Sequence, residues 1–369
     1  MSQKVRHVLG ISGGKDSAAL AIYMKDNYPE LDIEYYSSDT GKELEETYEL
    51  IRNLESYLGK KIHILRGAEN SEHEAFDHFL KQYSGYLPSS QARWCTKKLK
   101  LEPFERFIGN DLVISYVGIR GDEEREGYIS KKSNIQSIFP FRQNIWSEDV
   151  VAKFLSNSSI PMIQSWISEG VVEVDDEFIS LIDLPISPKF PQNRKASLLL
   201  NADVKSFNNL VFRFLQSTSY PLAQLSSFPL VENKDVLVKK DIFSILRNSG
   251  VGVPKYYEEM EFEVNGQVGH YSRSRSGCYF CFFQQKIEWV WLLEQHPELY
   301  TKAIAYEKEG YAWNERETLT ELMQPERVQQ IKADYIKREA AKKLTTHSMF
   351  LLDILDDSNE EEGCAACFI

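Results

Sequence analysis

Three features of the sequence predict a doubly wound α/β fold built on a parallel sheet. An apolar run at 5–11 leads into a glycine-rich turn, after which small and apolar residues recur at helical spacing as far as Met24. Apolar runs at 32–37, 62–65 and 112–118 predict three more strands, and an amphipathic helix is expected at 43–57. Strands that alternate with helices form parallel sheets with both faces covered. Ligands of such folds bind at the carboxyl ends of the strands.

Length and composition predict a soluble, cytoplasmic protein. The chain has 369 residues, of which 42% are hydrophobic and 27% are charged, which is enough for two domains. Apolar runs such as 289–293 and 349–352 are far shorter than the roughly 20 residues that cross a bilayer, and no apolar signal region is expected at the N-terminus. The net charge is −12, so a contact with nucleic acid must come from a local patch or from a partner.

Changes in pattern divide the chain into four regions. Residues 1–143 contain the predicted sheet and its turn. Residues 144–227 carry helix-like apolar patterns broken by Pro, Ser and Asn, which predict a helical insertion. Residues 228–352 form a C-terminal part with a C-x-x-C pair. Residues 353–369 are acidic and then end in a second C-x-x-C pair, and are expected to form a mobile tail.

Within the C-terminal part, the pattern predicts a helix from Asp241 and then a loop that reaches the segment 273–278. A second helix is expected through Trp289 to Gln295. A Lys- and Glu-rich helix is expected near 325–343.

The turn after the first predicted strand combines glycine, hydroxyl and charged residues. It consists of Ser12, Gly13, Gly14, Lys15, Asp16 and Ser17. Consecutive backbone N–H groups at the start of a helix favour an anion, and phosphate is the natural ligand. The turn is not a Walker P-loop, because Gly10 is one position too close to Gly14 and Asp16 stands where a magnesium-binding hydroxyl belongs. A capped glycine-rich turn without a ligand is the alternative.

This turn resembles the PP-loop, S-G-G-x-D-S, of the ATP pyrophosphatases, which split ATP between the α and β phosphates and hold pyrophosphate in the loop. Three further segments resemble the branch that includes phosphoadenosine phosphosulfate (PAPS) reductase. They are S-D-T-G-K-E at 38–43, R-W-C-T-K-K at 93–98 and G-I-R-G-D-E-E-R at 118–125. The resemblance covers 5–128 and 228–300, and it implies an adenine nucleotide alpha hydrolase-like fold that binds ATP and Mg²⁺.

The resemblance also implies which residues form the site. Those expected to bind the nucleotide are Ser12, Gly13, Gly14, Lys15, Asp16, Ser17, Ser38, Asp39, Thr40, Gly41, Glu43, Gly118, Arg120 and Glu123. Those expected to act in catalysis are Lys15, Asp16, Arg93, Lys97, Lys98 and Arg120. The cations would neutralise the polyphosphate, and Asp16 would hold Mg²⁺. Each of these charges, taken alone, also fits a solvated surface group.

The five cysteines are Cys95, Cys278, Cys281, Cys364 and Cys367. Five is a small and odd number of cysteines, which argues against a disulfide scaffold and for use in a metal site, a cluster or redox chemistry. Two C-x-x-C pairs suit Zn²⁺ or an iron–sulfur cluster, and spacing alone does not choose between them. Similarity to iron–sulfur APS reductases implies a [4Fe–4S] cluster on the first three, with its fourth iron bound by a tail cysteine or open to sulfur. The alternatives are Zn²⁺ and free redox cysteines. The tail pair is expected to supply a ligand, to carry a persulfide from a desulfurase or to close a disulfide during turnover.

Basic and aromatic residues flank the first C-x-x-C pair. His270, Arg273 and Arg275 precede it, and aromatic residues including Phe280 and Phe282 are interleaved with it. Such residues could grip a nucleic-acid backbone and stack a base. The alternative is that the aromatic rings pack around the cysteines.

One departure from the family bears on the reaction. Reductases of this branch carry a C-terminal E-C-G-x-H motif, whereas this tail reads Gly-Cys-Ala-Ala-Cys, so PAPS reduction is not favoured. The chain is more similar to the ATP pyrophosphatases of bacterial DNA phosphorothioation systems, which place sulfur in the DNA backbone and serve anti-phage defence. This implies a cysteine desulfurase, other modification subunits and DNA as partners, and no membrane. The alternatives are tRNA thiolation, PAPS or APS reduction, and a partner protein that senses ATP without turnover.

Overall fold

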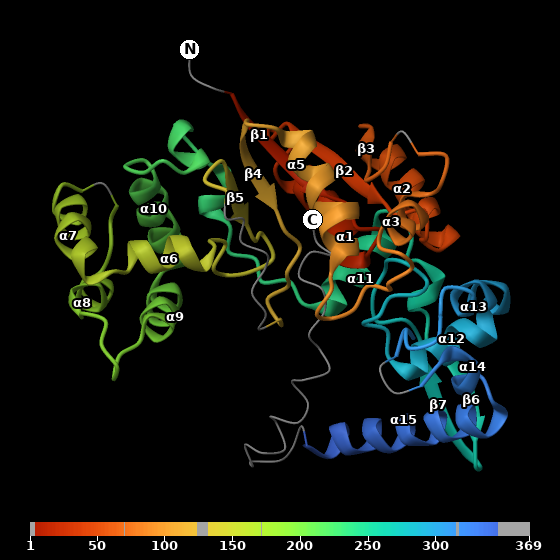
Figure 1. The fold of residues 1–369 in the computed structure, drawn as a ribbon. Coiled ribbons are helices and arrows are strands. Elements are labelled where there is room, and N and C mark those ends of the chain that lie inside the picture. The colour runs from red at the N-terminus through yellow and green to blue at the C-terminus, as the bar shows by residue number, and fades with distance from the viewer. Residues whose placement is uncertain (1–3, 70, 124–131, 171, 315–316, 346–369) are drawn as a thin grey trace.

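The computed structural model describes residues 4–69, 71–123, 132–170, 172–314 and 317–345. Its centre is a five-stranded sheet in the order β3-β2-β1-β4-β5, in which all neighbouring strands are parallel (Figure 1). The strands are β1 (Val5–Gly10), β2 (Ile33–Asp39), β3 (Ile62–Arg66), β4 (Leu112–Tyr116) and β5 (Ile135–Ile138). The predicted doubly wound α/β class is confirmed.

Successive residues of a strand point to opposite faces of the sheet. Both faces carry apolar residues here, and helices cover both of them. Leu9 of β1 belongs to a core shared with α1 (Lys15–Asn27) and α2 (Glu45–Leu58). Its neighbour Val8 belongs to a second core that includes residues of α5 (Glu102–Ile108). The elements between β3 and α5 are α3 (Ala75–Gln82), α4 (Trp94–Thr96) and the π-helix η1 (Lys97–Leu101).

Helix α2 forms because its apolar residues recur on one face. Leu50, Leu54 and Leu58 are buried at four-residue intervals. The helix ends at Gly59, which has a φ of 64°, a left-handed conformation that favours glycine. The same helix presents Thr47 to the turn that follows β1.

The sequence pattern did not predict β5. This strand has four residues, all of them buried, and it pairs with β4 so that Val113 lies opposite Ile135. A strand this short shows no clear alternation, and burial on both faces removes the polar residues that would mark it. Its place at the sheet edge brings Gln136 and Ser137 beside the helices that follow.

Helices fill the region between β5 and the C-terminal part, so a helical insertion is present. They are α6 (Glu148–Phe154), α7 (Ile160–Ser168), α8 (Asp176–Asp183), α9 (Gln192–Ala202) and α10 (Val204–Leu215). Buried residues such as Trp146, Phe154 and Phe207 join the core that lies under α1. The 3₁₀ turns η3 (Pro221–Gln224) and η4 (Pro229–Glu232) follow α10.

The C-terminal part contains a hairpin where the pattern predicted a loop. Strands β6 (Met260–Val264) and β7 (Gln267–Tyr271) are antiparallel, and Asn265 and Gly266 between them have φ values of 52° and 71°. Two left-handed residues form a type I′ turn, for which Asn-Gly is the strongest sequence signal. The loop prediction is therefore wrong, and this dipeptide would have corrected it. The helices of this part are α11 (Lys239–Asn248), α12 (Lys286–Gln295), α13 (Pro297–Ile304), α14 (Leu319–Leu322) and α15 (Pro325–Thr345).

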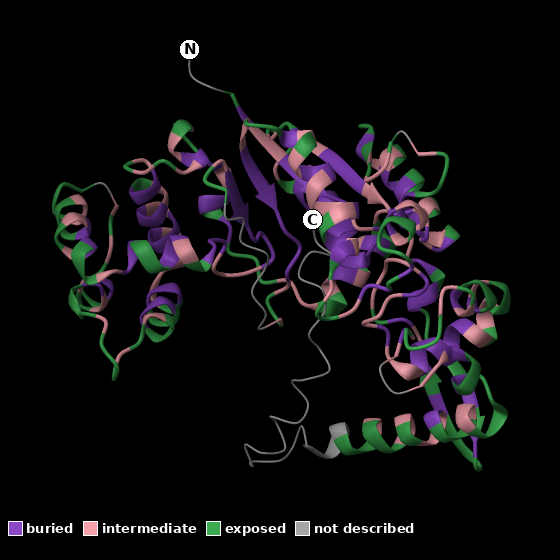
Figure 2. Cartoon of the chain, viewed as in Figure 1, coloured by how far each residue is buried: buried purple, intermediate pink, exposed green. Residues whose placement is uncertain are grey.

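Burial separates the sheet from the periphery. Figure 2 shows the inner strands and α1 as largely buried, whereas much of α15 is exposed. In the part of the chain that the structure describes, no helix combines the length and the apolar character that crossing a membrane requires. The tail at 353–369 lies outside the described residues.

Candidate functional site

The phosphate loop, residues 11–14, links β1 to α1 at the carboxyl end of a central strand. Gly14 directly precedes α1, so the N–H groups that follow it lie at a helix N-terminus. Gly13 has a φ of 74°, and a Cβ there would lie 2.2 Å from Cγ2 of Thr47. Only glycine fits this close approach, so the loop is held tightly against α2.

The hydroxyls of Ser12 and Ser17 shape the loop. The Ser12 N–H donates to the Ser17 hydroxyl over 3.1 Å, and the Ser17 hydroxyl donates to the Gly14 carbonyl over 3.2 Å. The Gly14 N–H donates to the Ser12 hydroxyl over 3.3 Å. Both serines, which were expected to bind nucleotide, therefore maintain the loop conformation in this structure.

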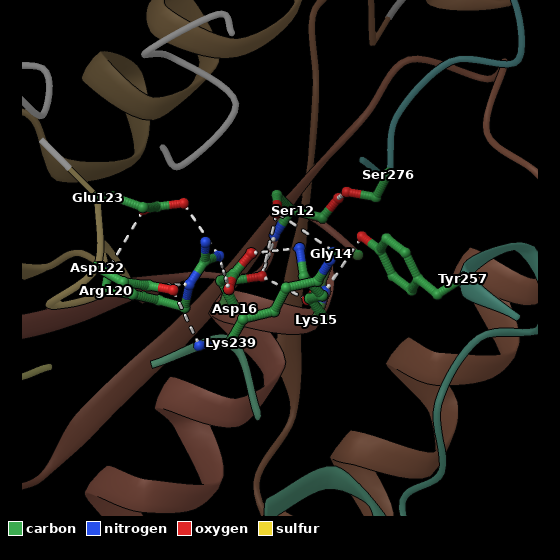
Figure 3. A network of polar contacts seen from close by, with 12 residues as sticks. Ser12, Gly14, Lys15, Asp16, Arg120, Asp122, Glu123, Lys239, Tyr257 and Ser276 are labelled. Atoms are coloured by element: carbon green, nitrogen blue, oxygen red, sulfur yellow. Dashed lines mark hydrogen bonds and ion pairs between the residues drawn. The ribbon is translucent and has the colours of Figure 1, made fainter. Parts of the chain in front are cut away.

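Three residues from the C-terminal part also hold the phosphate loop, and sequence analysis missed all of them. Tyr256 donates to the Gly13 carbonyl over 2.8 Å, and Ser276 donates to the Ser12 carbonyl over 3.3 Å. The Lys15 N–H donates to the Tyr257 hydroxyl over 3.4 Å (Figure 3).

A trans peptide directs its N–H away from its carbonyl. Fixing the Ser12 and Gly13 carbonyls therefore fixes where the N–H groups of the next residues point. These partners lie more than 240 residues from the loop, so no local pattern could have identified them.

A buried ion network lies at the start of α1. Lys15 Nζ is 3.0 Å from one Asp16 oxygen, and Arg120 Nη1 is 2.8 Å from the other (Figure 3). Arg120 also contacts Asp122 and Glu123 at 2.8 and 3.0 Å. Burial lowers the pKa of Arg120, but the neighbouring carboxylates, Asp16 above all, raise it well above its ordinary value. The guanidinium stays charged, and four predicted site residues are brought together here.

Asp16 orients two cations. Each of its oxygens contacts one positive group and keeps a further lone pair, so Mg²⁺ would share Asp16 with Lys15 and Arg120. Magnesium binding by Asp16 stays a prediction. Gly118 has a structural reason for its place after β4, because a Cβ there would lie 3.0 Å from the Asp16 carbonyl oxygen.

The segment at 38–43 lies at the carboxyl end of β2. Asp39 accepts hydrogen bonds from the Gly41 N–H over 2.9 Å and from the Tyr48 hydroxyl over 3.1 Å, and it pairs with Arg66 at 3.0 Å. Gly41 has a φ of 77°, which suits this tight turn. The Ser38 hydroxyl is buried and has no partner among the described residues.

A thiol lies beside this segment. Thr40 donates to Glu43 over 2.6 Å, and its hydroxyl is 3.2 Å from the Cys278 sulfur. Glu43 and Cys278 also form an isolated antiparallel bridge. Burial raises the pKa of the Glu43 carboxyl. The pKa of the Cys278 thiol is also raised, mainly by burial and then by the negative charge of Glu43. The positive charge of Lys100, a residue that sequence analysis did not single out, opposes both shifts.

Two of the basic residues of the segment at 93–98 have partners outside the phosphate loop. The Arg93 guanidinium lies 4.9 Å from the centroid of the Phe283 ring, and Lys98 pairs with Glu102 at 2.8 Å. Lys97 is exposed. Among the described residues, no hydrogen bond or ion pair joins any of these three cations to the phosphate loop. Their catalytic roles stay predictions.

The cysteine site is only partly described. Cys95, Cys278 and Cys281 are each partly exposed, whereas Cys364 and Cys367 lie outside the described residues. Within the described ranges, no three His, Cys, Asp or Glu side chains form a group that could hold a metal ion. The described cysteines alone therefore do not fit a four-thiolate site. The [4Fe–4S] cluster and its zinc alternative stay predictions.

Arg273 faces inward and does not form part of a surface that could bind nucleic acid. It is 2% exposed, its Nη2 donates to the Cys278 carbonyl over 3.1 Å, and its guanidinium lies 6.0 Å from the ring centroids of Tyr256 and Trp291. Phe280 is 1% exposed and packs in the same core. Both residues therefore agree with the interpretation that this region packs in the core, and not with the interpretation that it binds nucleic acid.

Comparison with known proteins shows which proteins the region around this site is similar to. Residues 6–168 match the family model described as the phosphoadenosine phosphosulfate reductase domain. An uncharacterized protein of Methanocaldococcus jannaschii is 34% identical over 154 residues, which cover 38% of this chain and 30% of that protein. The tRNA-specific 2-thiouridylase MnmA of Sulfurimonas denitrificans is 28% identical over 148 residues, which cover 39% of this chain and 43% of that enzyme. The matches span less than half the length of either relative.

A crystal structure of PAPS reductase from Candida auris in a phosphate complex is 20% identical, with a TM-score of 0.29, and the match covers 48% of this chain and 77% of that one. The region matched by the family model includes the phosphate loop, the segment at 38–43 and Arg120. Residues 6–168 of this chain are therefore similar to the phosphoadenosine phosphosulfate reductase domain.

Proposed function

We propose that the protein is an ATP pyrophosphatase that adenylates an oxygen of a nucleic acid so that sulfur can replace it. The most specific form of the proposal is phosphorothioation of the DNA backbone by a bacterial modification system that defends against phages. The observation that carries the sulfur chemistry is the 3.2 Å contact between the Cys278 sulfur and the Thr40 hydroxyl. It joins a thiol to the segment that resembles a nucleotide-binding motif.

In the first step, the acceptor oxygen attacks the α-phosphorus of ATP. A new P–O bond forms, the bond to the oxygen that bridges the α and β phosphates breaks, and pyrophosphate leaves with that electron pair. Lys15, Arg120 and the N–H groups of the phosphate loop stabilise the charge that develops on the leaving group. Asp16 positions the two cations, because each contacts one of its oxygens.

In the second step, the terminal sulfur of a persulfide, charged by a cysteine desulfurase, attacks the activated atom. The bond between that atom and the adenylated oxygen breaks, and AMP leaves with the oxygen. A second cysteine thiol then cleaves the remaining S–S bond, which transfers the sulfur and leaves a disulfide that a cellular thiol must reduce. The C-x-x-C pairs supply candidates for both sulfur atoms.

DNA is the acceptor that we propose. The net charge of −12 favours a subunit that meets DNA with the help of other modification subunits. Thiolation of tRNA is the second candidate, because a tRNA-specific 2-thiouridylase is among the relatives. Reduction of PAPS or APS is the third, because the family model is that of a PAPS reductase domain.

The test is incubation of anaerobically purified protein with Mg-ATP, with and without DNA or tRNA, and measurement of pyrophosphate against orthophosphate. Pyrophosphate together with AMP is expected. Transfer of radioactive sulfur from cysteine, through a desulfurase, then distinguishes DNA from tRNA. Orthophosphate with ADP, or no turnover with either acceptor, would overturn the proposal, and sulfite release from PAPS would favour the reductase.

A matched pair of variants links this activity to the phosphate loop. Lys15→Met removes a cation that contacts Asp16, while Lys81→Met removes an exposed cation of α3. Only the first is expected to abolish pyrophosphate release. Equal rates in the two variants would remove the loop from the mechanism.

A further inference from the structure

A polar cavity lies at the edge strand of the sheet, away from the phosphate loop. Its volume is about 230 Å³, and it is lined by β5 and the residues before it, by α6 and by the residues before η3. Nine of its ten lining residues are polar, and five of them carry hydroxyl groups. Ile135 and Gln136, which line it, lie opposite Val113 and Ile114 in the first half of β4, whereas the phosphate loop follows the last residue of β1.

The cavity has a neutral floor and a cationic rim. Gln136, Ser137 and Ser147 form the floor, with exposures of 2%, 7% and 3%. Lys132 and Lys153 lie at the rim and are exposed. Such a gradient suits a ligand whose uncharged hydrogen-bonding end enters first and whose anionic end stays near the solvent.

A hydrogen-bonded chain crosses one wall of the cavity. Lys153 Nζ donates to the Tyr220 hydroxyl over 2.7 Å and lies 4.6 Å from the centroid of that ring. The Tyr220 hydroxyl in turn donates to one oxygen of Asp149. Burial first, and then Asp149, raise the pKa of Tyr220, so the phenol remains a neutral donor. The wall is therefore built of fixed polar groups.

Two buried polar atoms of this cavity have no partner among the described residues. They are Nε2 of Gln136 and the second carboxylate oxygen, Oδ1, of Asp149. Gln136 is held in place, because its Oε1 accepts the Leu222 N–H over 3.1 Å. A buried polar atom without a hydrogen-bond partner is unfavourable, so each of these atoms favours a ligand that completes it. One atom requires an acceptor and the other requires a donor.

We propose that this cavity binds a phosphorylated pentose, either as the free sugar phosphate or as the sugar–phosphate part of a nucleotide. Pentose hydroxyls both accept and donate, so one ring satisfies Gln136, Asp149 and the floor serines together. The phosphate lies between Lys132 and Lys153. The volume is below the roughly 300 Å³ of the smallest drug-sized pockets, which also favours a small metabolite.

The charge balance at the rim agrees with a single phosphate. Lys132 pairs with Glu105 at 3.1 Å, and Lys153 is connected to Asp149 through Tyr220. The phosphate therefore meets two lysines whose charge is already partly compensated. Binding of moderate strength that weakens with salt is expected.

The proposal is tested by calorimetric titration and by ligand-induced shifts of the unfolding temperature, with ribose 5-phosphate, ribose, a nucleoside monophosphate and inorganic phosphate as separate probes. Ribose 5-phosphate is expected to bind the full-length protein more tightly than ribose or phosphate does. Lys153→Met is expected to weaken it by about tenfold. The matched control is Lys189→Met, an exposed lysine of the same insertion, which is expected to bind like the wild type.

Ser137→Ala removes one floor hydroxyl with little risk to folding, and its binding is expected to fall as well. Binding of the nucleoside monophosphate alone, lost in Lys153→Met but not in Lys189→Met, would identify the nucleotide as the source of the sugar phosphate. Equal affinity for inorganic phosphate, unchanged binding in Lys153→Met and Ser137→Ala, or no binding at millimolar concentrations would each overturn the proposal. None of these outcomes depends on ATP turnover.

Discussion

The Cys278 sulfur lies 3.2 Å from the Thr40 hydroxyl, although the two residues are 238 positions apart in the chain. Thr40 follows a central strand, in a segment that resembles a nucleotide-binding motif, and Cys278 begins a C-x-x-C pair. The contact places the Cys278 sulfur beside the segment that we propose to bind the nucleotide. In the proposed reaction the cations that stabilise pyrophosphate are different residues, Lys15 of α1 and Arg120.

We therefore expect Cys278→Ser to release pyrophosphate at close to the wild-type rate and to lose sulfur transfer. The serine hydroxyl preserves the contact with Thr40 but carries no transferable sulfur. The measurement is pyrophosphate release and radioactive sulfur incorporation on the same preparation. Thr40→Ser, which keeps the hydroxyl, is the control for local packing. Full sulfur transfer by Cys278→Ser would remove this cysteine from the reaction.

The metal content of the protein is a second prediction. Anaerobically purified wild type is expected to be brown and to contain iron and acid-labile sulfide, and Cys95→Ser and Cys281→Ser are expected to lose them. Elemental analysis with the visible spectrum measures this. One zinc per chain without colour would support the zinc alternative, and neither metal would favour redox cysteines.

Tyr257→Phe is expected to raise the KM for ATP by about fivefold, with a smaller effect on kcat. The phenol oxygen accepts the Lys15 N–H over 3.4 Å, and a hydrogen bond of this kind contributes about 1 kcal/mol. Steady-state pyrophosphate release measures both constants. Tyr311→Phe, at a tyrosine that is 44% exposed, serves as the comparison. If both variants behave like the wild type, the hydroxyl does not position the loop.

Gly13→Ala is expected to destabilise the protein by about 3 kcal/mol or more, because left-handed strain adds to a steric clash. The added Cβ would lie 2.2 Å from Cγ2 of Thr47. Gly59→Ala has similar strain, with a φ of 64° and no atom within 4 Å, and should cost only about 1–2 kcal/mol. Urea unfolding compares the two. Thr47→Ala should partly rescue Gly13→Ala, and a failure to do so would place the cost elsewhere.

His7 is expected to make the protein less stable in weak acid. Burial lowers its pKa to about 4, and its ring nitrogen Nδ1 lies 2.7 Å from the Tyr116 hydroxyl. In the unfolded chain the imidazole takes up a proton near pH 6.5. The His7 contribution is therefore fully present above pH 6.5 and is lost as the pH falls to about 4, by about 3 kcal/mol.

Urea unfolding at several pH values between 7 and 4 measures this loss. His7→Leu should be less stable than the wild type at neutral pH, because it gives up the contact with Tyr116, but its stability should change less with pH. Tyr116→Phe keeps the imidazole and should retain the pH dependence. Parallel curves for the wild type and His7→Leu would contradict the prediction.

Sequence analysis identified those parts of the molecule in which one local physical requirement sets the types of neighbouring residues. The strand before the phosphate loop is apolar because both of its faces are buried, and Gly13 is glycine because the chain passes Thr47 so closely. Local patterns of this kind predicted the sheet and the loop. The Asn265-Gly266 hairpin was also marked locally, and it was overlooked.

The rest depends on contacts between distant parts of the chain. Nothing near Tyr257 or Ser276 in the sequence indicates that they contact the phosphate loop. Arg273 has the composition of a surface cation, yet it lies among aromatic rings at 2% exposure. Only the folded chain distinguishes a buried arginine from an exposed one, because the burial comes from segments that are far away in sequence.

Hydrogen bonds from the C-terminal part fix the Ser12 and Gly13 carbonyls, so the conformation of the phosphate loop depends on that part of the chain. A fragment that ends at residue 168 would keep every motif of the matched domain and lose Tyr256 and Ser276. Its loop would be free to rotate the peptides that must face an anion. Chimaeras that exchange this domain between relatives would therefore need to exchange the distant tyrosine and serine along with it.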